Sequence, residues 1–245
     1  MSDLLGTLAI TSHRGGSGRS LLASGLAAWA SEQGIRTLLI DLAPGGGAAS
    51  LGPTGLMPHH DPWRGNSEPR PTALTRTLQA LRATPDAITG AGWAQIESRL
   101  AGWNTSLVVI DAPTLSRPLQ AGVLARCNVV LAAVPADANS LKSILPYLEF
   151  LAEEKHRPNR VFQPAAVLTR VQLDSPPMQA LFETASTFLG PLLLQGVIPE
   201  EETFARAMAQ GLMPSARHLS PAAAGAIDNV GRQLLAMLAP AGAAP

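Results

Sequence analysis

The sequence predicts an α/β fold in which a mostly parallel sheet is flanked by helices on both faces. Three observations lead to this fold class. Strand and helix patterns alternate along nearly the whole chain, which is typical of parallel βαβ units. The expected strands are short and continuously apolar, as in Arg36–Leu42 and Asn128–Val134, and such runs indicate strands covered on both faces. A glycine-rich turn also joins the first expected strand directly to the first expected helix.

Length and composition indicate one globular domain. The 245 residues are enough for a single domain over 1–239, followed by a flexible tail at 240–245. A hydrophobic fraction of 46%, a charged fraction of 15% and a net charge of zero exclude a disordered chain and give no general attraction to nucleic acid or anionic lipid. Cys127 beside an apolar run is expected to be a buried thiol, and a single cysteine fits a reducing compartment. The N-terminus lacks the basic region of a signal peptide, so we expect a cytoplasmic protein.

The individual elements follow from local patterns. Strands are expected at the apolar runs Leu4–Thr11, Arg36–Leu42, Ser106–Asp111, Asn128–Val134, Val161–Thr169 and Leu192–Ile198. Helices are expected at Ser20–Gln33, Thr72–Ala83, Trp93–Trp103, Arg117–Arg126, Asn139–Glu154, Pro177–Leu189, Glu200–Gln210 and Pro221–Leu238. Pro146 should kink its helix, and Pro164 interrupts its strand. Ala43–Pro71 has no evident regular structure, and we interpret its His59, His60 and Asp61 as loop residues rather than as a metal site.

The glycine-rich turn has the composition of a phosphate-binding loop. Gly15, Gly16 and Gly18 allow positive φ and close approach of the backbone to a ligand. The N–H groups of the loop and of the first helical turn can then converge on an anion. Ser20 stands where such loops place the hydroxyl that binds Mg²⁺, whereas Arg19 stands where the usual pattern has lysine. A glycine-rich turn without any ligand is the alternative.

Two expected strands end in a carboxylate. Asp41 lies at the end of one strand and Asp111 at the end of another. An apolar strand that ends in aspartate beside a phosphate loop holds Mg²⁺ in P-loop proteins, so we expect Ser20 and Asp111 to be the metal residues. The alternative is an aspartate that only caps the turn that follows its strand.

The loop sequence RGGSGRS resembles the deviant phosphate loop, KGGxGK[ST], of the ParA/MinD family of dimeric ATPases. Similarity continues at Ile40–Pro44, Ile110–Pro113, Val134–Ser140 and Val197–Gly211. The resemblance implies a P-loop fold that binds ATP and Mg²⁺ and forms an ATP-dependent homodimer. It also implies that Arg14 and Asp41 are the catalytic residues and that Arg14 reaches the partner's nucleotide. The nucleotide contacts it implies are Arg14, Gly15, Gly16, Ser17, Gly18, Arg19, Ser20, Leu21, Asp111, Arg170 and Pro199.

The chain departs from the family pattern at several positions. Ala43 stands where typical members have a second acid that helps to place the attacking water, and alanine offers no such group. Arg170 lies where many members have an adenine-reading asparagine. Arginine also replaces lysine at Arg14 and Arg19, and the two residues are not interchangeable. These departures predict tight nucleotide binding with slow or absent hydrolysis.

Several of these departures are shared with the BcsQ branch of the family. The shared features are Arg14, the altered lysine position at Arg19, Ala43, the run Asp137–Asn139 and a closing segment rich in alanine. This resemblance implies an accessory protein of the bacterial cellulose biosynthesis and secretion system that assembles or positions the inner-membrane synthase. It implies other cytosolic subunits, such as BcsR- or BcsE-like proteins, as partners, through which the chain would lie at the inner membrane.

Other readings of the sequence stay open. One is a partitioning or positioning ATPase that cycles on DNA, membrane or a partner protein, and another is a scaffold without nucleotide. The basic residues of the last third are scattered and are countered by Glu200, Glu201 and Glu202, so there is no strong sign of nucleic-acid binding. The final helix offers few basic residues for a membrane surface.

Overall fold

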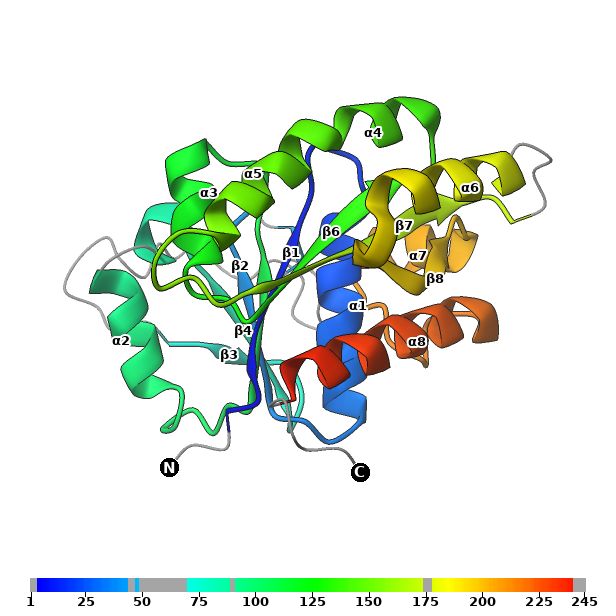
Figure 1. The fold of residues 1–245 in the computed structure, drawn as a ribbon. Coiled ribbons are helices and arrows are strands. Elements are labelled where there is room, and N and C mark those ends of the chain that lie inside the picture. Colours follow the sequence, from blue (N-terminus) through cyan, green and yellow to red (C-terminus); the bar gives the residue numbers. More distant parts are fainter. Residues whose placement is uncertain (1–3, 44–46, 49–69, 89–90, 174–177, 240–245) are drawn as a thin grey trace.

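The computed structural model describes residues 4–43, 47–48, 70–88, 91–173 and 178–239. They form an eight-stranded sheet in the order β3-β4-β2-β5-β1-β6-β7-β8 (Figure 1). All neighbouring pairs are parallel except β3 with β4, which confirms the predicted fold class. The strands are β1 (Gly6–Thr11), β2 (Thr37–Asp41), β3 (Thr72–Ala73), β4 (Leu78–Arg82), β5 (Leu107–Asp111), β6 (Val129–Pro135), β7 (Gln163–Val171) and β8 (Leu193–Pro199).

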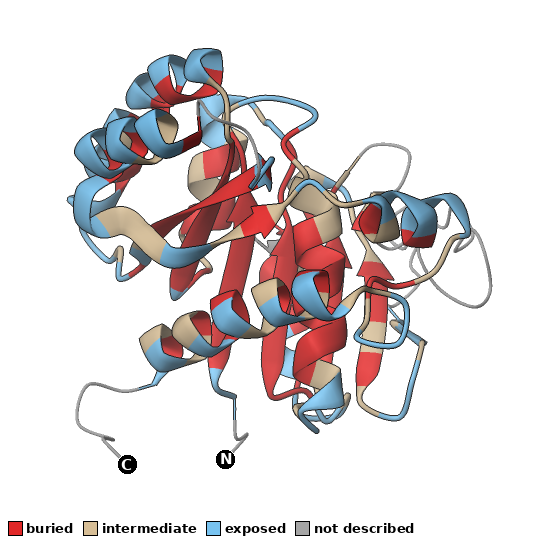
Figure 2. Ribbon diagram, turned by 90° about the vertical axis from the view of Figure 1, so that its right-hand side faces the viewer, coloured by how far each residue is buried: buried red, intermediate tan, exposed pale blue. Residues whose placement is uncertain are grey.

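Helices cover both faces of this sheet (Figure 1). They are α1 (Arg19–Glu32), α2 (Ala91–Arg99), α3 (Arg117–Leu124), α4 (Ala138–Ser143), α5 (Leu145–Lys155), α6 (Met178–Leu189), α7 (Glu202–Ala209) and α8 (Pro221–Leu238), with short 3₁₀ turns at Pro85–Ile88 and Gly190–Leu192. One core lies between the sheet and α1, α7 and α8, and a second lies between the sheet and α2 to α6. The buried strands between these two layers stand out in Figure 2.

The packing of α8 against α1 fixes the helix that follows the glycine loop. Gly231 of α8 lies against the ring of Trp29 in α1, so close that a Cβ at Gly231 would come within 2.5 Å of two ring atoms. The indole Nε1 of Trp29 donates to Asp228 Oδ1 at 2.9 Å. Glycine at this crossing therefore brings the two helices into direct contact.

The predicted helix at Thr72–Ala83 is wrong. This segment forms β3, a turn and β4, and β4 extends the sheet by pairing in parallel with β2. Leu78, Ala80 and Leu81 are buried in this arrangement. Pairing with an existing strand and burial on both faces outweigh the local helix propensity of the segment.

Proline explains two further differences. The predicted helix Asn139–Glu154 is divided at Ile144 into α4 and α5, with Pro146 in the first turn of α5, where its missing N–H is tolerated. Pro164 lies within β7 but before Ala166, where pairing with β8 begins, so the strand tolerates it.

Other expectations concern segments and groups outside the site. Cys127 is buried as predicted, and burial raises the pKa of its thiol to about 12. In the described part of the chain no helix is long and apolar enough to cross a membrane. The predicted tail at 240–245 and the loop residues His59, His60 and Asp61 lie outside the described residues.

Candidate functional site

The candidate site is built around the loop between β1 and α1. Gly16 and Gly18 have φ of 72° and 77°, so both use the left-handed conformation that favours glycine. Gly15 does not adopt positive φ. Among the residues that the structure describes, and apart from the chain neighbours, no atom lies within 4 Å of a Cβ built on Gly15 or Gly16, so the described part of the chain leaves the loop backbone open on that side. Gly18 is the N-cap of α1, so the loop leads directly into the helix N-terminus.

The loop is tied to the end of β7. The hydroxyl of Thr169 donates to the carbonyl of Ser17 at 2.8 Å, and both side chains are buried. Arg170 Nη1 also donates to the carbonyl of Gly16 at 3.5 Å. Thr169 could not be predicted as a loop anchor, because nothing in the sequence shows that β7 lies beside the loop.

The side chain of Arg19 points to Asp111 at the end of β5. Its Nε donates to Asp111 Oδ1 at 2.6 Å, in an ion pair whose side chains are only 13% and 0% exposed. Its Nη2 lies 3.4 Å from Ser20 Oγ and its Nη1 lies 3.5 Å from Ser12 Oγ. The structure thus brings together Ser20 and Asp111, the two predicted metal residues, and places the guanidinium of Arg19 against both.

The two strand-end aspartates lie side by side at one edge of the sheet. Asp41 and Asp111 are paired in the register of β2 with β5, and both are buried. Asp41 accepts from the backbone N–H of Ala43 and of Gly47, each at 2.8 Å, and Asp111 Oδ2 accepts from the N–H of Ala48 at 3.3 Å. The short segment 47–48 therefore lies directly over the aspartates.

Gly47 packs against the same carboxylate and hydroxyl. A Cβ at this position would lie 2.7 Å from Ser20 Oγ and 2.8 Å from Asp111 Oδ2. Only glycine permits this approach without a shift of its neighbours. Gly47 was not predicted as a site residue, because it is one of several neighbouring glycines and the sequence does not indicate which of them contacts the site.

Arg14 is paired within its own chain. Its Nη2 lies 2.8 Å from Asp137 Oδ2, and both side chains are about two-fifths exposed. Asp137 also caps α4 by accepting from the backbone N–H and the hydroxyl of Ser140. Burial alone would raise the pKa of Asp137, but the hydrogen bonds from Ser140 and the charge of Arg14 outweigh it and lower that pKa.

Arg170 and Pro199 lie at the ends of the adjacent strands β7 and β8. Arg170 has a φ of 57° and pairs with Glu200 at 2.8 Å, while Gln172 donates to the other oxygen of Glu200 at 2.8 Å. Hydrogen bonds from Arg170 and Gln172 lower the pKa of Glu200. Arg170, Gln172 and Glu200 line a cavity of about 340 Å³ together with Asp137, the partner of Arg14. Glu200 and Gln172 were not predicted.

The remaining predicted residues follow the loop into the helix. Ser17 is buried beneath the loop, and Leu21 packs against the core beside α1. In the described ranges no group of three histidine, cysteine or acidic side chains is placed to hold a metal ion.

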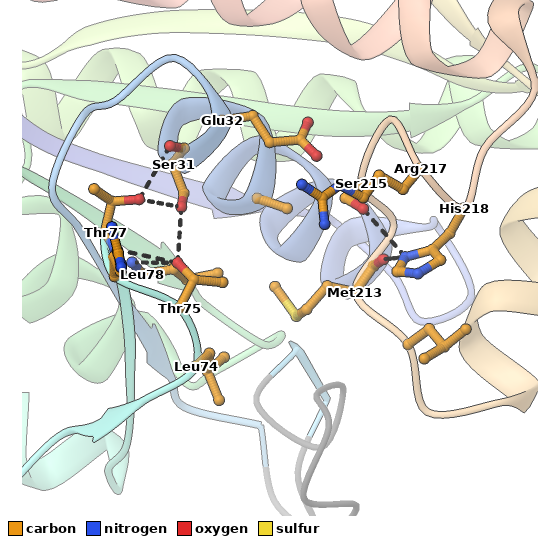
Figure 3. A pocket seen from close by; sticks show the side chains of 13 residues that line it. Ser31, Glu32, Leu74, Thr75, Thr77, Leu78, Met213, Ser215, Arg217 and His218 are labelled. Atoms are coloured by element: carbon orange, nitrogen blue, oxygen red, sulfur yellow. Dashed lines mark hydrogen bonds between the residues drawn. The ribbon is translucent and has the colours of Figure 1, made fainter.

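A second hollow lies at the opposite end of α1. This cavity of about 550 Å³ lies between the last turn of α1, the turn from β3 to β4 and the segment before α8 (Figure 3). Ser31 and Thr77 face each other on one wall, joined by a hydrogen bond of 2.7 Å, and His218 and Met213 line the other. None of the loop residues from Arg14 to Ser20 lines it.

Comparison with known proteins gives one family. The model of the CobQ/CobB/MinD/ParA nucleotide binding domain matches residues 8–214. The chromosome-partitioning ATPase Soj of Thermus thermophilus is 31% identical over 153 residues, which cover 60% of this chain and 61% of that protein. The alignment with this relative therefore spans about three-fifths of its length.

Solved structures of similar fold cover nearly the whole chain. The MinC:MinD cell division complex of Aquifex aeolicus is 19% identical with a TM-score of 0.76, covering 94% of this chain and 96% of that one. An ATP complex of a McdA variant from Cyanothece is 17% identical with a TM-score of 0.76, covering 96% and 97%. Cobyrinic acid a,c-diamide synthase of Mycobacterium smegmatis, with an ATP analogue and magnesium, is 20% identical with a TM-score of 0.72, covering 94% and 93%. At these identities the likeness shows the fold.

Proposed function

Because the chain belongs to the CobQ/CobB/MinD/ParA nucleotide-binding family, we propose that it is an ATP-binding switch of the ParA/MinD kind in which nucleotide joins two copies and hydrolysis is slow. One observation carries this proposal: the glycine loop enters α1 directly beside the paired aspartates that end β2 and β5. The McdA structure with ATP and the synthase structure with an ATP analogue and magnesium support ATP as the nucleotide.

The phosphates would be held by the backbone of Gly15–Ser20. The left-handed conformations at Gly16 and Gly18 and the N-terminus of α1 provide the N–H groups and the positive helix end that favour an anion. The absence of contacts around Gly15 and Gly16 supports access to the loop. Arg170 and Pro199 border this region from β7 and β8 and are proposed to lie on the base side.

Dimerisation would use Arg14. Its side chain is exposed on the loop, and a guanidinium can grip phosphate oxygens through two N–H groups. In the single chain Arg14 is paired with Asp137. To contact a partner's nucleotide, Arg14 must therefore leave the carboxylate of Asp137 and bind a phosphate group instead. An exposed ion pair contributes only about 0.2–1 kcal/mol, which makes the exchange easy.

Slow hydrolysis is expected from the hydrogen bonds of Asp41 and from the absence of a second acid at Ala43. Both oxygens of Asp41 accept backbone N–H groups, and Ala43 has no acid to orient a water molecule. Loss of a general base or water-orienting group lowers the rate by about 10²–10⁴. Nucleotide binding depends on the loop backbone instead and is expected to persist.

We further propose that the cargo of this switch is the cellulose secretion machinery. Arg14, Ala43 and the run Asp137–Asn139, whose first residue caps α4 and pairs with Arg14, support this assignment. The partners would be BcsR- or BcsE-like cytosolic proteins, and the chain would reach the inner-membrane synthase through them.

A second candidate function is a partitioning ATPase that cycles on DNA or a partner protein. The similarity to Soj, a chromosome-partitioning ATPase, favours it. The two candidates differ in the rate of ATP hydrolysis. The slowly hydrolysing switch keeps its ATP bound, whereas a cycling ATPase is stimulated to hydrolyse ATP by its partner or by DNA.

Calorimetry and light scattering test the proposal. Wild-type protein should bind ATP and a non-hydrolysable analogue and become a dimer with either, and Arg14→Ala should bind nucleotide but remain monomeric. Arg206→Ala, which removes an exposed arginine of α7 paired with Glu202, is the matched control and should dimerise normally. If neither nucleotide binds at millimolar concentration, the proposed function is wrong. Steady-state ATP hydrolysis near or above about one turnover per second would instead exclude a switch with slow hydrolysis.

A further inference from the structure

We infer that Arg19 is a built-in cation that occupies the Mg²⁺ position at Asp111, so that Mg²⁺ must displace it to reach this carboxylate. The inference rests on the proposed function, because it concerns the same loop, but it can be tested without nucleotide. It goes beyond the family pattern, since it depends on an arginine where the usual loop has lysine.

Arg19 neutralises the buried charge of Asp111. Asp111 is completely buried, and a buried carboxylate without a partner is strongly unfavourable. Arg19 supplies that partner at 2.6 Å, and its own side chain is only 13% exposed. Because a guanidinium is never deprotonated in proteins, this positive charge is permanent and need not be taken up from solution.

The contacts of Arg19 support the same inference. The guanidinium touches one carboxylate oxygen of Asp111 and lies near the hydroxyls of Ser20 and Ser12. A carboxylate and a serine hydroxyl on this loop are the protein groups that Mg²⁺ would use. Arg19 and Mg²⁺ would therefore have the same partners.

The surroundings of the Asp111 carboxylate are crowded. Mg²⁺ keeps several water ligands and demands near-octahedral geometry, so it needs room around it. The backbone of Gly47 lies so near Ser20 and Asp111 that a single added carbon would be 2.7 Å and 2.8 Å from their oxygens. Arg19 and the backbone N–H of Ala48 already hold the two oxygens of the buried Asp111 carboxylate, so a hydrated ion would reach Oδ1 only after Arg19 moves.

Thermal unfolding of the nucleotide-free protein with and without millimolar Mg²⁺ tests the inference. Arg19→Ala should lower the Tm by about 10 °C, because Asp111 is left buried and unpaired. Mg²⁺ should then restore at least half of that loss, but should leave the wild-type Tm unchanged. The double variant Arg19→Ala/Asp111→Asn should not respond to Mg²⁺, and neither should Arg206→Ala, which removes an exposed arginine of α7 outside the site.

Two further measurements keep the test decisive. Arg19→Gln keeps a donor for Asp111 without the charge and serves if Arg19→Ala does not fold; it too should be stabilised by Mg²⁺. ATP affinity of the wild type should change less than about threefold when EDTA replaces Mg²⁺, whereas Arg19→Gln should lose tenfold or more.

The outcomes separate the two proposals. Stabilisation of the wild type by Mg²⁺ as large as that of the variants, or no response of either variant, would overturn the role of Arg19. Absence of ATP binding under every condition would overturn the proposed function, while the unfolding experiment would still decide the role of Arg19.

Discussion

Gly231→Ala should destabilise the protein by forcing α8 away from α1, the helix that follows the glycine loop. A Cβ at position 231 would lie 2.5 Å from two ring atoms of Trp29 and 2.7 Å from a third. The ring cannot swing aside freely, because Trp29 is buried and its Nε1 is hydrogen-bonded to Asp228. Overpacking of this kind costs about 1–3 kcal/mol, and loss of a hydrogen bond to a charged group costs about 1.5–3 kcal/mol.

The gain in helix propensity offsets only part of this. Replacing glycine by alanine inside a helix is worth about 1 kcal/mol, so the net destabilisation should be about 2 kcal/mol or more. For a chain of this size that corresponds to a fall in Tm of about 4–8 °C.

Gly225→Ala in the same helix is the matched control. This exposed glycine has no atom within 4 Å of its built Cβ, so only the propensity gain remains and the Tm should rise by about 1–4 °C. Circular dichroism melts of the two variants side by side make the comparison. Equal shifts of the same sign in both variants would refute the argument that Gly231 is required by its contact with Trp29.

Two other predictions concern charge and reactivity. Asp137→Asn should keep the cap of α4, since asparagine caps as well as aspartate, but release Arg14 and strengthen the ATP-dependent dimer by up to about fivefold in sedimentation equilibrium; an unchanged or weaker dimer contradicts it. Because the pKa of Asp137 is lowered, the restraint on Arg14 is fully present above the ordinary aspartate pKa and should be lost in the wild type only as pH falls through that lowered pKa. Cys127, with a pKa of about 12, should not react with a chromogenic disulfide at pH 8 until denaturant is added; rapid reaction of the native protein would show that the thiol is accessible.

The parts of the site that the sequence predicted follow from short-range rules. Asp41 and Asp111 end apolar strands, and the carboxyl ends of neighbouring parallel strands meet at one edge of the sheet, which is where β2 and β5 place them. The glycine loop joins a strand to a helix within one βαβ unit, so its position at that edge was also predictable. These residues needed no knowledge of distant contacts.

Long-range pairing explains the errors. Thr72–Ala83 contains leucines at intervals that suit a helix, but the segment lies beside β2 and completes the sheet as β4. Nothing within the segment says that an unpaired strand edge is available to it. Thr169 likewise anchors the loop at Ser17, more than 150 residues away in the sequence, only because β7 lies two strands from β1.

Arg19 shows a limit of a different kind. Its position in the loop was predicted, and so was its charge, but the side chain could turn either outward to a phosphate or inward to Asp111. In the structure it turns inward, because leaving the fully buried carboxylate of Asp111 unpaired would cost more free energy than leaving an exposed guanidinium in water. When nucleotide enters the loop, phosphate becomes a competing anion, and the balance depends on whether Mg²⁺ can take over Asp111. A lysine at this position would lack the planar guanidinium, which reaches the carboxylate of Asp111 and the hydroxyls of Ser12 and Ser20 together. Arginine in place of lysine therefore changes which cation is paired with Asp111, and not only the strength of phosphate binding.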